Sequence, residues 1–150
     1  MDIKSKSERS ENMAKIRARD TKPEMFIRSS LHKEGFRFKV SDSTVVGKPD
    51  LYFSKKRVAI FVHGCYWHRH QGCKFSYVPK SNVDFWIRKF DSNVKRDLNV
   101  REKLLSQNIR VLVVWECTVK KMIKSAELHE ITLHKITFFL GDNSISYLEL

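Results

Sequence analysis

The stretch RVAIFVHGCYWHRHQGC, residues 57–73, joins an apolar segment to a loop that is rich in histidine and cysteine. The near-continuous apolar run from Val58 to Val62 predicts a central strand in a sheet that is covered on both faces. The loop that follows holds three histidines and two cysteines, together with Tyr66 and Trp67. In open α/β sheets, functional sites lie just past the carboxyl ends of such strands. We therefore expect this loop to contain the site.

Segments before and after this run supply the rest of the predicted sheet. DLYF, residues 50–53, is a second strand candidate, and FRFKV, residues 36–40, is a third because its apolar residues stand at every second position. IRVLVVWEC, residues 109–117, follows a long helical pattern. A β-branched run after a helix favours a βαβ crossover to a parallel strand. The predicted fold class is α/β, with a mixed central sheet flanked by helices.

Three segments have the apolar spacing of amphipathic helices. The first begins at residues 21–24, where Thr21 can cap the helix and Glu24 can close a capping box, and it ends at Gly35. The third covers residues 118–140. The second is opened by Ser81 and Asp84, and its predicted buried face consists of Trp86, Phe90, Val94, Leu98 and Leu105. Before all of them, residues 7–19 predict either a basic N-terminal arm or helix, or a solvated and partly disordered tail.

Composition and charge indicate a single domain with a polyanionic partner. The chain has 150 residues and a formal net charge of +12, with lysine and arginine spread over most of its length. This charge favours nucleic acid, with an anionic membrane surface as the competing partner. The N-terminus lacks the apolar core of a signal peptide, and no run of about 18 apolar residues occurs. We expect a soluble cytoplasmic protein that binds no membrane.

The three cysteines are too few, and odd in number, for a disulfide scaffold. Cys65 follows one predicted strand and Cys117 follows another, so neighbouring strands would bring Cys117 near the loop that holds Cys65 and Cys73. Three thiolates and one imidazole can form a closed tetrahedral site for structural Zn²⁺. The spacing does not decide whether His68 or His70 supplies the imidazole. The alternative is that these are ordinary buried cysteines.

GKPD, residues 47–50, and FVH, residues 61–63, form a second candidate site. An acidic residue that starts one strand and a polar residue late in the next can converge to hold a divalent metal beside a phosphate. Asp50 is the candidate carboxylate. A Pro-Asp pair is also an ordinary turn, so a purely structural role for Asp50 stays open.

Six motifs resemble, in order and spacing, those of the very-short-patch repair (Vsr) endonucleases, bacterial enzymes that nick DNA at T:G mismatches. They are RSENM, RDTKPE, GKPDLYF, FVHGCYWHRHQGC, DFWIRKFDSNVKRD and RVLVVWEC, and the match covers about residues 8–118. The resemblance implies a restriction-endonuclease-like fold. In it, Phe61, Val62 and His63 replace the usual Glu-x-Lys half of the nuclease motif.

The resemblance also implies roles for individual residues. His68 would activate water, and Asp97 would orient the ring of His68. His63 and Glu24 would order metal-bound waters or stabilise charge. The implied catalytic ion is Mg²⁺, bound by Asp50 and by the backbone carbonyl of Val62, where some members have threonine. The implied ligands of the structural Zn²⁺ are Cys65, His70, Cys73 and Cys117.

For DNA, the resemblance implies that Tyr66, Trp67 and Trp86 form an aromatic wedge beside the mismatch, with Met13 entering from the opposite groove. Unstacking costs least where the base pair is already weakened. Trp86 has a structural alternative, since it shares the helical apolar pattern and could belong to the core. Glu24 could serve the capping box, alone or together with its implied role.

The implied protein is a monomeric endonuclease with one domain over residues 1–150, including a DNA-contacting arm or helix at residues 1–20 and a helical extension at residues 118–150. It would nick one strand at T:G mismatches that arise from deamination of 5-methylcytosine, initiating very short patch repair in the bacterial cytoplasm, in association with the nucleoid. Double-stranded DNA with a T:G mismatch is the expected partner, and a mismatch-repair protein and a cognate cytosine methyltransferase are candidate protein partners. The alternatives are a restriction-type endonuclease acting on intact duplex and a non-catalytic zinc-stabilised DNA-binding module.

Overall fold

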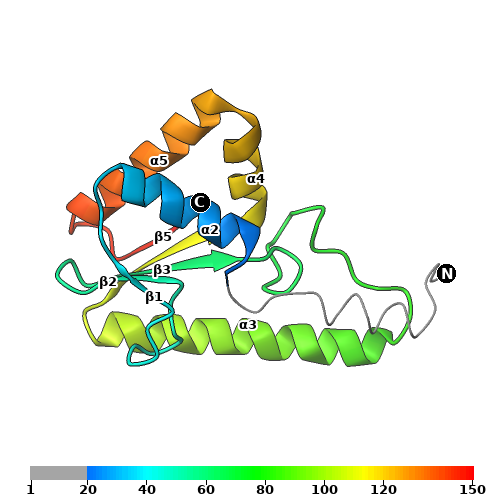
Figure 1. Cartoon of the computed structure of the whole chain (residues 1–150). Helices are drawn as coiled ribbons and strands as arrows, with labels where there is room; N and C mark the ends of the chain where they lie inside the picture. Colours follow the sequence, from blue (N-terminus) through cyan, green and yellow to red (C-terminus); the bar gives the residue numbers. More distant parts are fainter. Residues whose placement is uncertain (1–19) are drawn as a thin grey trace.

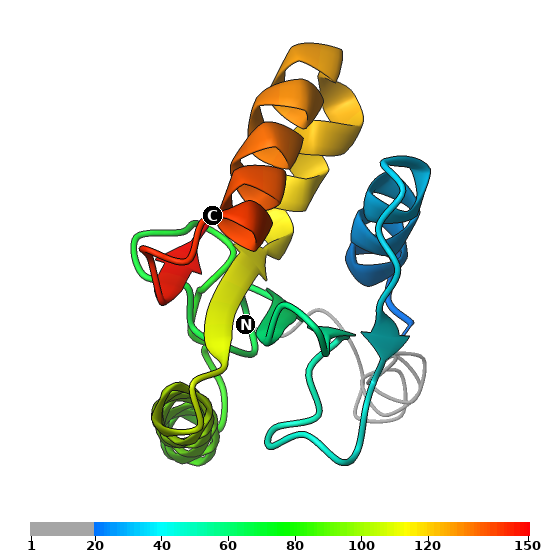
Figure 2. The same cartoon turned by 90° about the vertical axis from the view of Figure 1, so that its left-hand side faces the viewer.

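The computed structural model describes residues 20–150 and shows a five-stranded mixed sheet with helices on both faces (Figure 1 and Figure 2). The strands stand in the order β1-β2-β3-β4-β5, with antiparallel pairing from β1 to β3 and parallel pairing from β3 to β5. The predicted mixed sheet is confirmed. Met13 and almost all of the predicted N-terminal arm lie outside the described residues. The elements are α2 (Lys22–Lys33), β1 (Lys39–Val40), β2 (Leu51–Phe53), β3 (Val58–His63), α3 (Val83–Ser106), β4 (Arg110–Trp115), α4 (Glu116–Lys124), α5 (Ala126–Gly141) and β5 (Tyr147–Glu149).

The unit β3-α3-β4 places the two strands that precede the candidate ligands side by side. β3 and β4 pair in parallel, from Val58 with Arg110 to His63 with Trp115. α3 connects them along one face of the sheet (Figure 1). This confirms the predicted βαβ crossover. Because both strands end at the same level, the loop after His63 lies next to the start of α4.

β4 is buried along its whole length because helices cover both faces of the sheet. Leu112 and Val114 belong to a core cluster with residues of α2, α4 and α5. Val111 and Val113 belong to a second cluster, which includes Leu104 of α3. Successive side chains of a strand point to opposite faces, so a continuous apolar run is what such a strand requires. The layers are α2, α4 and α5, then the sheet, then α3 (Figure 2).

Arg110, the first residue of β4, is buried with its guanidinium against the end of α5. Its Nη1 donates to the carbonyls of Phe139 at 2.6 Å and Asp142 at 2.8 Å, and its Nη2 donates to the carbonyl of Leu140 at 3.3 Å. A further bond reaches the carbonyl of Ile145 at 3.3 Å. These carbonyls satisfy a charge that would otherwise be costly to bury. The contact ties the start of β4 to the chain that leads into β5.

α2 begins and ends as the sequence predicts. Thr21 is the N-cap, and its Oγ1 accepts a hydrogen bond from the Glu24 amide at 3.4 Å. The Glu24 carboxylate accepts from the amide of Asp20 at 3.0 Å, so the reach-back ends one residue before the cap. Gly35 follows the helix at φ +92°, a left-handed conformation that glycine adopts without steric cost.

The predicted strand at residues 36–40 is reduced to Lys39–Val40. Phe36 and Phe38 instead pack their rings on Phe53, with centroid distances of 6.2 and 5.5 Å. Their alternation therefore reflects side-chain contact with the core and not a longer ladder of backbone hydrogen bonds.

The predicted buried face of α3 is wrong at two positions. Phe90 and Leu104 are the buried residues of this helix, whereas Val94 and Leu98 are each 43% exposed and line a cleft. The physical reason is the length of the helix. Only its C-terminal part contributes to the core cluster on the sheet, so apolar residues nearer the N-terminus border open space.

The C-terminal region is not the single helix that was predicted. Ser125 has an extended backbone, with φ −136° and ψ 117°, and separates α4 from α5. Its side chain caps α5 by accepting from the Leu128 amide at 3.2 Å, a role that serine fills better than a helix-interior position. After α5 the chain adds β5 to the sheet, so residues 118–150 contain a strand as well as helices. Within the described part of the chain, no helix is long and apolar enough to cross a membrane.

Candidate active site and metal cluster

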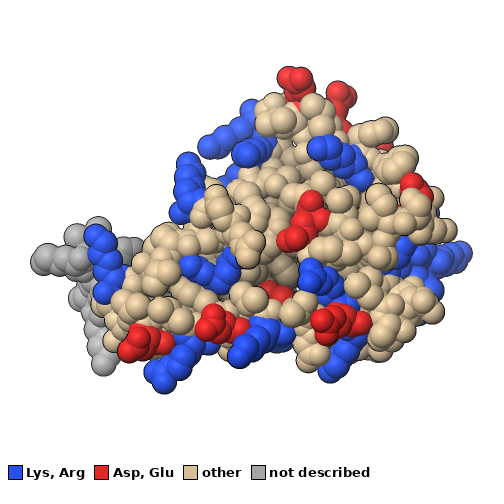
Figure 3. Space-filling view, turned by 180° about the vertical axis from the view of Figure 1, so that it is seen from behind, with Lys and Arg blue, Asp and Glu red and all other residues tan. Residues whose placement is uncertain are grey.

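A cleft of about 1370 Å³ is lined by residues from α2, from the ends of β3 and β4, and from α3. Trp67 lines this cleft, whereas Tyr66 and Trp86 are not among its lining residues. Figure 3 shows basic side chains spread over the rear face with acidic ones between them, so the positive charge is not concentrated in one patch there. Of the residues predicted to act in catalysis, the cleft brings together Glu24, Asp50, Val62, His63, His68 and Asp97.

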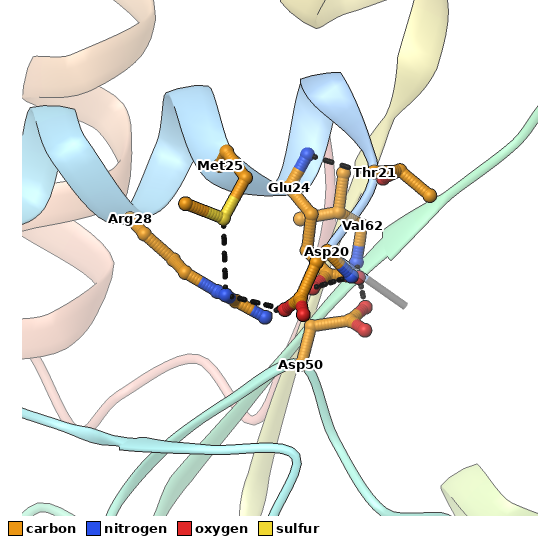
Figure 4. Close-up of polar contacts among 7 residues, drawn as sticks. All are labelled: Asp20, Thr21, Glu24, Met25, Arg28, Asp50 and Val62. Carbon is orange, nitrogen blue, oxygen red and sulfur yellow. Dashed lines mark hydrogen bonds and ion pairs between the residues drawn. The ribbon is translucent and has the colours of Figure 1, made fainter. Parts of the chain in front are cut away.

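Glu24, Asp50 and Val62 form one end of the cleft, which we call the carboxylate corner (Figure 4). Asp50 Oδ2 accepts a hydrogen bond from the Val62 amide at 2.7 Å. Burial raises the pKa of Asp50 to about 8, and the adjacent Glu24 carboxylate adds to the shift. The N–H and C=O of a strand residue point to the same side, so the Val62 carbonyl faces the side of Asp50. Two carboxylates and a carbonyl are oxygen ligands of the kind that Mg²⁺ prefers, so these residues fit such an ion.

Arg28 supplies a positive charge beside this corner (Figure 4). Its guanidinium forms ion pairs with Glu24 and with Asp20, the latter at 2.8 Å, and its side chain is only 13% exposed. Among the described residues, the buried Nε of Arg28 has no hydrogen-bond partner. The sequence reasoning missed Arg28. Its i,i+4 spacing from Glu24 on α2 is the signal that could have indicated it.

His63 and His68 also line the cleft, and their rings stand face to face. Their rings stack with centroids 3.9 Å apart and an angle of 4° between the planes. His68 Nδ1 lies 2.6 Å from Asp97 Oδ2 on α3. Burial, together with the nearby His68, lowers the pKa of His63 to about 3, so this ring is neutral at physiological pH. Because Asp97 engages Nδ1 of His68, Nε2 is the nitrogen available to exchange a proton.

Cys65, His70, Cys73 and Cys117 form a second group, which we call the cysteine–histidine cluster. Their ligand atoms all lie within 4.8 Å of one another, and the three cysteines are free. His70 Nδ1 lies 3.6 Å from Cys65 Sγ and 3.4 Å from Cys117 Sγ. Burial raises the pKa of Cys65 to about 12, so a nearby cation is needed to keep this thiol ionised. Three sulfurs and one imidazole nitrogen fit tetrahedral Zn²⁺, and it is His70, not His68, that lies with the cysteines.

Trp115 contacts both the His63–His68 pair and the cysteine–histidine cluster. This position was not predicted from the sequence. Its ring stacks on His70 at 4.2 Å with an interplanar angle of 6°, and meets the edge of His63 at 5.5 Å. Its Nε1 donates to Glu149 Oε1 at 3.0 Å. The sequence pattern identifies Trp115 only as a strand residue. Its pairing with His63, which follows from the parallel register, is the signal that links it to the site.

The residues predicted to form a wedge lie together beside the first turns of α3. Tyr66 contacts Trp67 and Trp86, at centroid distances of 4.9 and 6.3 Å. Trp86 also stacks on the buried Phe90 at 5.7 Å, so it is attached to the body of the protein as well as to this group. Tyr77, which was not predicted, lies 5.1 Å from Tyr66 and is 63% exposed.

Comparisons with known proteins agree with the resemblance of the motifs. The family model described as DNA mismatch endonuclease Vsr matches residues 1–74. The chain is 43% identical over 119 residues to the Type II nicking enzyme V.NmeAIP of Neisseria meningitidis, and the match covers 79% of this chain and 84% of the relative. It is 40% identical over 119 residues to the DNA mismatch endonuclease Vsr of Escherichia coli, a match that covers 79% of this chain and 76% of the relative. It is 39% identical over 110 residues to the Type II nicking enzyme V.XorIIP of Xanthomonas oryzae, covering 73% and 80%.

Proposed function

This chain belongs to the family of DNA mismatch endonucleases Vsr, and on that premise we propose that it nicks one strand of duplex DNA at T:G mismatches. The mismatches would arise from deamination of 5-methylcytosine, and the nick would initiate very short patch repair. One observation supports this proposal above the others. A single cleft is lined by the Glu24 and Asp50 carboxylates, by the hydrogen-bonded His68 and Asp97, and by Trp67.

The carboxylate corner is the proposed site of catalytic Mg²⁺. Asp50 and the Val62 carbonyl would hold the ion, and Glu24 would order water around it. Bound there, the ion supplies positive charge that polarises the scissile phosphate and stabilises the charge that develops in the transition state. The valine at position 62 is compatible with this role because the proposed contact uses the backbone.

His68 is the proposed general base. With Nδ1 held by Asp97, its Nε2 would take a proton from a water molecule as the water oxygen bonds to phosphorus. The bond from phosphorus to the leaving oxygen would break, and the leaving oxygen would take up a proton from solvent water. His63, which is neutral, would stabilise charge or order water without itself taking up a proton.

The remaining roles concern the fold and the DNA. We assign structural Zn²⁺ to the cysteine–histidine cluster and a restriction-endonuclease-like fold to the single domain. Tyr66, Trp67 and Trp86 would form the wedge that unstacks the duplex, with Met13 entering from the other groove. Base stacking on an aromatic ring is worth about 1–3 kcal/mol, which is of the size needed to offset unstacking at a weakened pair.

The cellular setting is also part of the proposal. The protein would act as a monomer on double-stranded DNA in the bacterial cytoplasm, in association with the nucleoid. A mismatch-repair protein and a cognate cytosine methyltransferase are proposed as protein partners.

Nicking of defined duplexes tests the proposal. Two duplexes that differ only in one T:G or C:G pair are incubated with the protein, with and without added Mg²⁺. We expect Mg²⁺-dependent cleavage of one strand of the T:G duplex only. Equal cleavage of both duplexes would favour a restriction-type nuclease, and binding without cleavage would favour a non-catalytic DNA-binding module.

A further inference from the structure

Arg69 stands between His68 and His70, and the three consecutive side chains serve three different parts of the molecule. His68 reaches Asp97 in the cleft, and His70 reaches the thiols of the cysteine–histidine cluster. Arg69 has a left-handed backbone, with φ +56°. This conformation is costly for a residue with a Cβ and persists only where the surrounding contacts impose it.

The guanidinium of Arg69 makes the contacts that hold this conformation. Nη1 donates to the carbonyls of Tyr66 at 3.0 Å and Tyr77 at 3.1 Å, and Nη2 donates to the carbonyl of Ser76 at 2.7 Å. The guanidinium carbon lies 3.9 Å from the ring centroid of Phe90 and 5.7 Å from that of Tyr66. One side chain thus joins both arms of the loop to each other and to α3.

These contacts act on residues that are not themselves candidate metal ligands, although Ser76 Oγ also donates to the carbonyl of Cys65 at 2.6 Å. The candidate metal ligands would fix Cys65, His70 and Cys73, but not the aromatic residues between and beyond them. Asn93 of α3 holds the adjacent backbone from the other side, since its Nδ2 donates to the carbonyl of Trp67 at 3.0 Å. The backbone of Tyr66 and Trp67 is therefore held by two side chains, of which Arg69 makes the larger number of contacts.

We propose that Arg69 is a positioning residue for mismatch nicking: it fixes Tyr66 and Trp67 at a set distance from His68. This inference rests on the proposed function, in which the aromatic rings enter the duplex while His68 acts on the backbone. Arg69 follows His68 directly and bonds to the carbonyl of Tyr66. A movement of Tyr66 and Trp67 would therefore also shift the ring of His68. Misplacement by about 1 Å can cost on the order of a hundredfold in rate.

The role requires a guanidinium. A planar fork can donate to three carbonyls while its face lies on Phe90, whereas a lysine ammonium offers a point charge that cannot do both. Arg69→Lys keeps the positive charge and so preserves attraction to phosphate. It removes the geometry alone.

The test compares Arg69→Lys with Arg37→Lys in the full-length, zinc-loaded protein. Arg37 is a matched control because it also donates to two backbone carbonyls, those of His32 and Phe36, but lies outside the cleft. Single-turnover nicking is measured on the T:G and matched duplexes, together with DNA affinity, zinc content and Tm. A 2-aminopurine beside the mismatch reports unstacking through its fluorescence.

We expect Arg69→Lys to slow nicking of the T:G duplex at saturating protein by about ten- to a hundredfold and to reduce the 2-aminopurine signal. Affinity should change by less than about threefold, since the charge is kept, and zinc content should stay at the wild-type value. Asn93→Ala should act in the same direction with a smaller loss, and Arg37→Lys should match the wild type. If Arg69→Lys keeps the wild-type rate and fluorescence signal, or slows nicking while the fluorescence signal stays at the wild-type value, the inference is overturned. A wild type that nicks both duplexes equally would instead overturn the proposed function.

Discussion

The carboxylate corner includes Val62 of β3, and the cysteine–histidine cluster includes Cys65, which follows the end of β3, yet the polar groups of the two have different kinds of partner. In the corner, Asp50 accepts a hydrogen bond from the Val62 amide, and Glu24 is paired with Arg28, so both acidic groups have protein partners. In the cluster, the three thiols face mainly one another and His70. Glu24, Asp50 and Val62 all line the cleft, whereas of the cluster only His70 does, with the Trp115 ring stacked on it. This difference is the one expected if the corner is the proposed Mg²⁺ site, open to exchange of ligands, and the cluster is the proposed closed site for Zn²⁺.

Asp50→Asn gives the largest expected effect, because it removes one charge from the corner while keeping an acceptor for the Val62 amide. Nicking of T:G duplexes should fall by about 10³-fold or more, since a metal-bound carboxylate contributes several kcal/mol to transition-state stabilisation. Folding and T:G binding should persist. Single-turnover nicking and a binding titration at low salt measure the two effects. Loss of binding in parallel with nicking would contradict the division of roles.

Cys117→Ser changes the cysteine–histidine cluster and should lower the stability of the fold first, with loss of activity as a consequence. Three remaining ligands cannot close a tetrahedral zinc site, so zinc content should drop and Tm should fall by on the order of 10 °C. Elemental analysis and thermal unfolding report both quantities. Thr118→Ser, one residue along α4, is the control and should match the wild type. If the wild type, purified without chelators, contains no zinc, the assignment of this cluster is wrong.

The third prediction concerns pH and has the smallest expected effect. Without a divalent ion, folded Asp50 holds its proton up to a pKa of about 8, whereas the unfolded chain releases it near 3.8. The stability of the metal-free corner therefore falls as pH rises between these values. Binding of Mn²⁺ must displace this proton, so affinity should rise about tenfold per pH unit up to pH 8 and then level off.

Electron paramagnetic resonance of free Mn²⁺ measures this affinity, with zinc bound throughout. The pKa of His63, at about 3, lies outside the window, so it should not contribute to the slope. Asp50→Asn should bind Mn²⁺ weakly and without this dependence. A wild-type affinity that does not change between pH 6 and 8 would show that the carboxyl is already ionised there.

The sequence predicts those helices and strands whose apolar residues follow a regular spacing or a continuous run. β4 is a continuous apolar run because both its faces are covered, and this pattern predicted the crossover that brings Cys117 near Cys65. The choice between His68 and His70 could not come from spacing. It depends on the direction in which each side chain leaves the loop, and Arg69, which stands between them, has a left-handed backbone.

Other residues were missed because their partners are distant in sequence or belong to the backbone. Arg69 bonds to carbonyl groups, which leave no mark on the residue types around them. Val94 and Leu98 were assigned to the core because helical spacing identifies an apolar face but not what that face meets. In this protein it meets a cleft, because α3 extends beyond the sheet that it covers.

The bonds of Arg110 have a consequence for how the chain is synthesised and turned over. The guanidinium at the start of β4 finds its acceptors 29 to 35 residues later, in residues that leave the ribosome after β4. Until those residues emerge, the Arg110 guanidinium lacks these carbonyl acceptors, and β4 lacks its neighbour β5. A product cut short after residue 141 would lose the carbonyls of Asp142 and Ile145 and the strand that follows. Such a product would open more often, and cellular proteases would remove it although every residue of the cleft on β3 and α3 is present.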